Sequence, residues 1–214
     1  MRGVKTEMTV EVVQYLAEHS RQDDVLARVE QETAEMPNAG LQVTPDEGAL
    51  LTLLVQLLQA RELLEVGTFT GYSAICLARG LADGGRLTCL ELDQEYADMA
   101  RRNLEMAGVD DRVEIRVGPA LDSLDQIPEE PQFDLVFLDA DKENYPGYYE
   151  RILPRLKTNG LLLIDNTLLH GSVLEPQGGR EDVVAELNDT IANDERVDTA
   201  MVLVTDGLTF VRKR

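Results

Sequence analysis

Residues 62–80 read ELLEVGTFTGYSAICLARG, and this stretch decides the fold. Glu62–Gly67 is a short apolar run of strand length, and Gly67 and Gly71 frame a tight turn. Apolar residues at helical spacing follow, which predicts a helix over 72–81. A buried strand that passes through a glycine turn into a helix is the building unit of α/β folds.

The same order of strand and helix repeats along the chain. Because apolar strands that alternate with helices form a parallel sheet covered on both faces, we expect an α/β fold with a mostly parallel sheet. Two further strands, joined by a Thr-Asp-Gly hairpin turn, close the chain. After the first strand and helix, the expected strands are 86–92, 113–117, 133–139, 159–165, 199–204 and 208–211, and the helices are 94–107, a short one near 121, 145–156 and 181–192.

The segment before the first strand is expected to be helical. We expect residues 1–43 to form an N-terminal helical extension of a single domain over 1–214. A further helix begins after Thr44, where Pro45 suits the first helical position and Glu47 completes a T-x-x-E capping box. That helix is apolar on nearly every face, so we expect it to be largely buried.

Composition narrows the class of protein. The chain has 40 acidic and 20 basic residues and a net charge of −20, which disfavours broad electrostatic binding to nucleic acid. No apolar run approaches the roughly 20 residues that span a bilayer, and the charged N-terminus lacks the apolar core of a signal peptide. Cys76 and Cys89 are expected to be buried thiols in a reducing compartment, so we expect a cytoplasmic protein.

Acidic residues lie near the ends of four expected strands. These are Glu65, Glu91, Asp139 and Asp165. In open α/β sheets the ligand binds beyond the carboxyl ends of the strands, where the strand order switches. We therefore expect these acids to line one site.

The glycine turn differs from a dinucleotide-binding turn. Phe69 occupies the middle position, where the G-x-G-x-x-G fingerprint needs glycine to admit a pyrophosphate. This favours a nucleoside ligand without a pyrophosphate; a purely structural turn is the alternative. Glu91 follows Gly67 by 24 residues, so it either accepts hydrogen bonds from a ribose diol or is a solvated acid.

Two carboxylates and an amide form a candidate metal site. Asp139, Asp165 and Asn166 offer only oxygen ligands, which favours Mg²⁺, Mn²⁺ or Ca²⁺ over zinc. Polar strand ends without a metal are the alternative. A cation nearby would favour the neutral amine of Lys142, as a general base requires. Otherwise Lys142 is a surface lysine paired with Glu143.

Four motifs, taken together and in order, resemble the cation-dependent class I O-methyltransferases of the catechol and caffeoyl-coenzyme A type, which include small bacterial members. The motifs are TPDEGALL (44–51), EVGTFTGYS (65–73), FLDADKENY (137–145) and LLLIDNTLLHGSV (161–173). The resemblance implies a Rossmann-like sheet of seven strands with an antiparallel last strand, a bound S-adenosylmethionine, a divalent cation, most simply Mg²⁺, and a homodimer.

The resemblance also assigns roles to single residues. Asp139, Asp165 and Asn166 match the metal ligands and Lys142 the catalytic lysine, while His170 stands at a substrate-contacting position where plant members have asparagine. From the sequence itself, His170 either lines the site or is a bystander. The residues expected at S-adenosylmethionine are Val43, Glu65, Gly67, Thr68 and Ser73 at its methionine end, Glu91 at the ribose, Ala120 at the adenine, Asp141 at the ammonium, and Asp139 beside them.

The predicted reaction is metal-dependent methyl transfer from S-adenosylmethionine to a hydroxyl of a catechol-like small molecule. Three alternatives stay open at this point. One is methylation of hydroxylated uridine in transfer RNA, which the charge of −20 disfavours. The others are a nicotinamide dehydrogenase, which Phe69 disfavours, and a non-catalytic module that binds a nucleoside or a metal.

Overall fold

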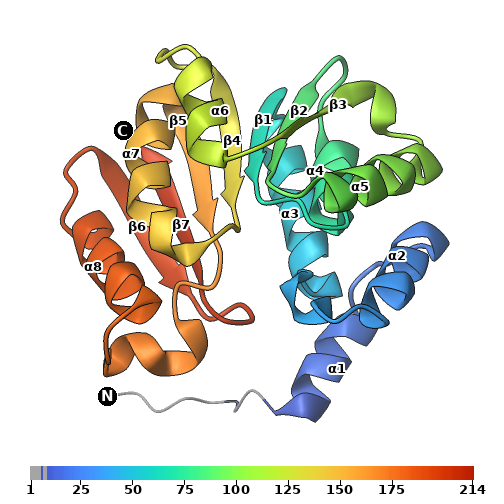
Figure 1. Cartoon of the computed structure of the whole chain (residues 1–214), viewed down its shortest axis with the longest axis horizontal. Helices are drawn as coiled ribbons and strands as arrows, with labels where there is room; N and C mark the ends of the chain where they lie inside the picture. The colour runs from blue at the N-terminus through green and yellow to red at the C-terminus, as the bar shows by residue number, and fades with distance from the viewer. Residues whose placement is uncertain (1–5, 7–8) are drawn as a thin grey trace.

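The computed structural model describes Thr6 and residues 9–214, which build one seven-stranded sheet with helices on both faces (Figure 1). The strands are β1 (Glu62–Val66), β2 (Arg86–Glu91), β3 (Val113–Val117), β4 (Phe133–Leu138), β5 (Leu156–Ile164), β6 (Val197–Val202) and β7 (Leu208–Lys213). The helices are α1 (Val10–Glu18), α2 (Asp24–Ala34), α3 (Pro45–Leu58), α4 (Tyr72–Gly80), α5 (Gln94–Ala107), α6 (Ala120–Gln126), α7 (Tyr145–Arg155) and α8 (Arg180–Ala192), with short 3₁₀ segments that include η3 (Lys142–Asn144) and η4 (Leu169–Leu174).

The strand order confirms the expected fold class. The sheet runs β3-β2-β1-β4-β5-β7-β6. The first five strands are parallel, and β7 runs antiparallel to both of its neighbours. The chain moves outward from β1 to β3 and then returns to place β4 beside β1. This switch in strand order is where a ligand site is expected.

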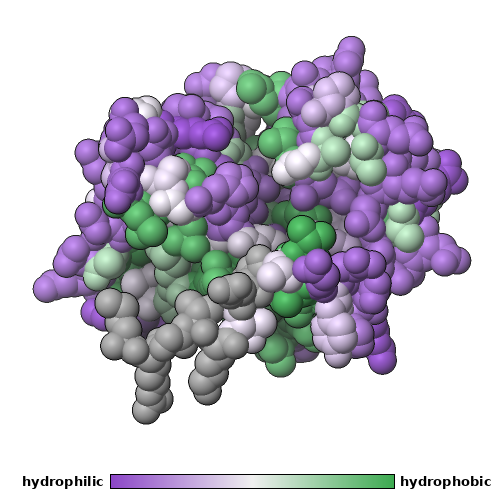
Figure 2. Space-filling view, turned by 90° about the horizontal axis from the view of Figure 1, so that it is seen from below, coloured by the Kyte–Doolittle hydropathy of each residue, from purple (hydrophilic) through white to green (hydrophobic). Residues whose placement is uncertain are grey.

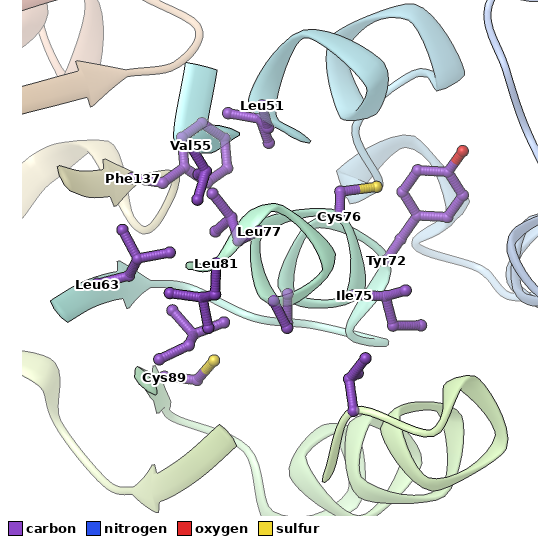
Figure 3. Packing of buried hydrophobic residues seen from close by; sticks show 14 of the residues in the cluster. Leu51, Val55, Leu63, Tyr72, Ile75, Cys76, Leu77, Leu81, Cys89 and Phe137 are labelled. Carbon is purple, nitrogen blue, oxygen red and sulfur yellow. The ribbon is translucent and has the colours of Figure 1, made fainter. Parts of the chain in front are cut away.

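Alternating side chains of each strand supply two cores. On one face, Leu63 and Phe137 pack with helices α2 to α5; on the other, Leu64 and Leu138 pack with α6, α7 and α8. Helix α4 is buried at every position except Arg79, and Figure 3 shows its side chains surrounded by those of α3 and the sheet. Since side chains of a strand alternate in direction, apolar residues at successive positions fill both cores.

Helix α3 departs from the sequence prediction in two respects. Thr44 is the N-cap residue, but its side chain makes no capping hydrogen bond, so the predicted capping box is wrong. Glu47 instead turns into the protein, where it is 1% exposed. Leu53 and Leu57 are 55% and 79% exposed, so the helix buries one side only, although both of its sides are apolar.

The largest differences in element boundaries are in β5 and β6. β5 begins at Leu156, directly after α7, because Leu156 already pairs with Phe133 before the register shifts. β6 covers 197–202 rather than 199–204, since its pairing with β7 begins at Val197.

Within residues 9–214, no helix is both long and apolar enough to pass through a lipid bilayer. Both cysteines are buried free thiols, as expected.

Candidate active site

Backbone hydrogen bonds just beyond the strands align the strand ends. The amide of Asp139 donates to the carbonyl of Val66 at 2.9 Å, and the amide of Asp165 donates to the carbonyl of Leu138 at 3.0 Å. The ends of β1, β4 and β5 therefore lie side by side, as the topology requires. From below the view of Figure 1, the molecule shows apolar side chains gathered between hydrophilic flanks (Figure 2).

The turn after β1 is built around Gly67. Its φ is +90°, and a Cβ there would lie 1.9 Å from the carbonyl oxygen of Asp139, so only glycine lets β1 and β4 approach this closely. Glu91 holds the turn from β2. Its Oε2 accepts hydrogen bonds from the amides of Thr68 at 3.0 Å and Phe69 at 2.7 Å, and its Oε1 accepts one from Asp93 at 2.9 Å.

Glu65 lies beneath this turn with no exposed surface. Neither of its carboxylate oxygens has a hydrogen-bond partner within the described residues, and burial raises its pKa to about 7. The buried hydroxyl of Thr68 is unpartnered as well. Because buried polar groups without partners are costly, these atoms are suited to a polar ligand seated on the turn. Val43 and Ser73, expected at the same ligand, are also buried.

The other two residues expected at the cofactor lie at the same edge. Ala120 opens α6 and is half-buried. Asp141 follows β4, and its carboxylate accepts a hydrogen bond from the Tyr148 hydroxyl at 2.6 Å and another from the Asn144 side chain. Asp141 is exposed, so its carboxylate is accessible to a ligand.

Acidic side chains converge where β4 and β5 end. Asp165 is 3% exposed, and burial together with the charge of Asp139 raises its pKa to about 7. Glu47 from α3 joins them: burial and the charges of Asp165 and Asp139 raise its pKa to about 9. Sequence reasoning missed this position of Glu47, because its T-x-x-E spacing equally fits a helix cap.

These residues fit a divalent cation. Asp139, Asp165 and Asn166 supply oxygen atoms, and mutual repulsion of buried carboxylates is what a cation relieves. Within residues 9–214, no three His, Cys, Asp or Glu side chains converge closely enough to hold a metal by themselves. A ligand set built on the two aspartates would take the side-chain amide of Asn166 as its third member.

Lys142 points into this cluster from η3. Its Nζ donates to Asp139 Oδ1 at 2.9 Å and to the Tyr145 hydroxyl, and its side chain is 12% exposed. Tyr145 in turn donates to the backbone carbonyl of Asp165 at 3.1 Å. Lys142 is thus fixed beside the aspartates and is not a surface lysine paired with Glu143.

His170 lies at the rim of the site. Its ring is 90% exposed, and its amide donates to Asp206 Oδ1 at 2.6 Å. The turn that carries Asp206 also binds the backbone of Thr167 and Leu168. Neither Asp206 nor its neighbour Thr205 was expected near the site, because the sequence shows only a hairpin turn there.

Comparison with known proteins decides the family. A family model described as O-methyltransferase matches residues 17–214. The chain belongs to this family. It is an S-adenosylmethionine-dependent O-methyltransferase, as the four motifs indicate, so the dehydrogenase alternative is excluded.

Similar proteins come from plants and bacteria. The methyltransferase is 36% identical to a caffeoyl-CoA O-methyltransferase of Eucalyptus gunnii over 94% of this chain and 86% of that one. It is 37% identical to an O-methyltransferase of Bacillus cereus solved in complex with SAH, with a TM-score of 0.87 over 95% of this chain and 97% of that one. It is 33% identical to an O-methyltransferase of tomaymycin synthesis from Streptomyces achromogenes in complex with SAM, with a TM-score of 0.84 over 95% and 96% of the chains.

Proposed function

We propose that this methyltransferase transfers a methyl group from S-adenosylmethionine to one hydroxyl of a catechol-like small molecule, with the help of a divalent cation. One observation carries the proposal. Lys142 Nζ lies 2.9 Å from Asp139 Oδ1, at the edge where Asp165 and Asn166 also lie. The candidate base therefore lies directly beside a candidate ligand of the cation.

The methyl donor would be held by the groups around the β1 turn. Glu65 and Thr68 offer unpartnered polar atoms to its methionine end. Glu91 already accepts three backbone hydrogen bonds, and a carboxylate has room for about four, so it can still accept a hydroxyl of the ribose. Asp141 is accessible to the donor's ammonium, and Ala120 lies where the adenine is expected.

Asp139, Asp165 and Asn166 would hold the cation. When bound, a Mg²⁺ ion supplies Lewis acidity toward the two oxygens of a vicinal diphenol and fixes their orientation. Asp165 is 3% exposed and the Asp139 side chain 19%, so the two carboxyl groups are largely shielded from solvent just beyond β4 and β5. Removal of the cation with EDTA is therefore expected to abolish methyl transfer.

Lys142 would act as the general base. The neutral amine takes the proton of the hydroxyl that is to be methylated, and the oxygen keeps the electron pair of the broken O–H bond. The ammonium that forms is then stabilised by Asp139 and by the Tyr145 hydroxyl, both of which already accept hydrogen bonds from Nζ. The resulting phenolate attacks the methyl carbon of S-adenosylmethionine; the bond between that carbon and sulfur breaks, its electron pair stays on sulfur, and S-adenosylhomocysteine leaves. Correct orientation of the phenolate would supply much of the rate.

Three features bear on the acceptor. The most similar curated relatives include caffeoyl-CoA O-methyltransferases, which favours a phenolic acceptor. The net charge of −20 disfavours transfer RNA, the alternative acceptor. His170 at the rim is placed to contact a substrate that extends outward from the site, since its ring is largely exposed.

The test is a methylation assay with caffeic acid and S-adenosylmethionine, read by mass spectrometry. A product heavier by one methyl group is expected with Mg²⁺ present. In parallel, the enzyme is given unmodified transfer RNA and transfer RNA that carries hydroxylated uridine. If the RNA is methylated and no member of a panel of diphenols is, then the acceptor is transfer RNA and the proposed phenolic acceptor is wrong.

A further inference from the structure

Glu47 is a buried carboxylate that the reaction described above does not use. It lies in the first turn of α3 and is 1% exposed. Its Oε2 accepts a hydrogen bond from the Thr205 hydroxyl at 3.2 Å, while its Oε1 has no partner within the described residues. A carboxylate in this position is costly unless a positive charge lies nearby.

The surroundings of Glu47 provide no such charge from the described part of the protein. No Lys, Arg or His described by the structure forms an ion pair with it. Its nearest charged neighbours are Asp165 and Asp139, which repel it. Lys142 Nζ is bound to Asp139 instead. The unpartnered Oε1 of Glu47 is therefore buried beside the aspartates that are expected to hold the cation.

We propose that Glu47 is an outer-sphere carboxylate of the cation site, which strengthens cation binding without being one of the ligands. The inference rests on the proposed metal dependence. An outer-sphere position follows because Glu47, Asp139 and Asp165 do not converge closely enough to share one ion directly. Partners of this kind orient the ligands and add to the field at the ion, and their loss typically weakens metal binding about 10–100-fold.

Thr205 is the positioning residue for Glu47. It adopts a φ of +44° in the turn between β6 and β7, a conformation that is uncommon for a β-branched residue. The same turn accepts hydrogen bonds from the amides of Thr167 and Leu168, at Gly207 and Asp206 respectively, both at 3.0 Å. The turn thus joins Glu47 on α3 to the segment directly after the candidate ligands Asp165 and Asn166.

The experiment is calorimetric titration of Mn²⁺ into the full chain, without S-adenosylmethionine or phenol. We expect Glu47→Gln to weaken Mn²⁺ binding about tenfold or more, since glutamine keeps the shape but cannot become a carboxylate beside the cation. Glu105→Gln is the matched control: it makes the same replacement at an exposed position on α5, and Glu105 makes no ion pair within the described residues. Its affinity for Mn²⁺ is expected to match the wild type.

Thr205 provides a second pair of variants. Thr205→Ala removes the hydroxyl that holds Glu47 and should weaken Mn²⁺ binding, whereas Thr205→Ser keeps the hydroxyl and should restore it. Circular dichroism and thermal melting of each variant identify those that fold. If Glu47→Gln does not fold, the Thr205 pair decides the question.

The outcomes separate the two proposals. A wild-type chain that binds no Mn²⁺ contradicts the proposed metal dependence itself. A wild-type chain that binds Mn²⁺, together with a folded Glu47→Gln variant of equal affinity, contradicts the role of Glu47 alone. Equal affinities of Thr205→Ala and Thr205→Ser contradict the positioning role of Thr205, and they contradict the proposal as a whole if Glu47→Gln is unfolded.

Discussion

Glu65 is a buried carboxyl that destabilises the folded protein when it is ionised, and it is also a residue that we expect to bind S-adenosylmethionine. It is fully buried without a hydrogen-bond partner, and burial raises its pKa from 4.5 to about 7. Between these two values the folded chain binds more protons than the unfolded chain, so the contribution of Glu65 to stability falls as pH rises through that window. The charge that is useful for holding a cationic ligand is unfavourable in the ligand-free protein.

Replacement of Glu65 by glutamine should therefore stabilise the ligand-free protein above neutral pH. A shift from 4.5 to about 7 corresponds to about 3 kcal/mol once the group is fully ionised. In urea unfolding, the free energy of unfolding of the wild type should fall relative to that of Glu65→Gln as the pH rises from about 5 to about 8. If the free energy of unfolding changes with pH in the same way in both proteins, then folding does not shift the pKa of Glu65. The same variant should bind S-adenosylmethionine more weakly than wild type in calorimetry.

Lys142 is the residue on which the chemistry depends most. Lys142→Ala should lower kcat on the order of 100- to 10,000-fold, because it removes the general base. The affinity for S-adenosylmethionine should not change, since Lys142 is expected to bind the acceptor's proton and not the donor. Lys157→Ala is the control: Lys157 pairs with Asp134 at 2.7 Å and is not among the residues expected at the site. A Lys142→Ala variant with full activity would contradict the assignment of Lys142 as the general base.

The sequence predicts the site residues that lie at strand ends, but not those that reach the site from a helix or from a hairpin turn. Glu65, Asp139 and Asp165 lie at or just beyond strand ends, and the alternation of strands and helices alone places such residues at one edge. Glu47 and Thr205 come from a helix and a hairpin turn that meet the site from different parts of the chain. No local pattern reports such a contact, and the T-x-x-E spacing around Glu47 is satisfied equally by a helix cap.

The turn between β1 and α4 can be tested by two glycine substitutions with similar backbone strain. Gly67 and Gly84 both have positive φ, but only at Gly67 would a Cβ collide with backbone, at 1.9 Å from the Asp139 carbonyl oxygen. Gly84→Ala should cost about 1 kcal/mol from backbone strain. Gly67→Ala should cost about 2 kcal/mol more and should also weaken S-adenosylmethionine binding.

Chemical denaturation of the two variants checks this comparison. Equal destabilisation by the two substitutions would mean that the close approach of β1 and β4 is not required. Retained cofactor affinity in Gly67→Ala would likewise separate the turn from the cofactor site.

At the scale of the whole molecule, one side of α3 packs into the protein and the other side is exposed. The sequence pattern predicts a mostly parallel sheet and the family resemblance predicts an antiparallel last strand, whereas the strand order and the position of β7 between β5 and β6 come from the structure. The exposure of Leu53 and Leu57 was not expected, because an apolar helix is ordinarily buried on all sides within its own chain. We propose that this side of α3 belongs to the expected homodimer.

Light scattering tests the homodimer. Wild type should have the mass of two chains of 23.8 kDa each. Leu57→Asp should shift it toward the monomer, because it places a charge on a residue that is 79% exposed in the single chain. Leu92→Asp is the control at another exposed leucine, which lies directly after β2 and is 70% exposed. A monomeric wild type, or a dimer that Leu57→Asp leaves intact, would contradict this assignment.

The central claim, that a divalent cation held by Asp139, Asp165 and Asn166 is required for O-methylation, is tested most directly by one activity measurement. Methyl transfer from S-adenosylmethionine to caffeic acid is followed with Mg²⁺, with EDTA, and after Mg²⁺ is restored in excess over EDTA. We predict that activity is lost in EDTA and returns with Mg²⁺. Methylation that proceeds at the same rate in EDTA would contradict the account.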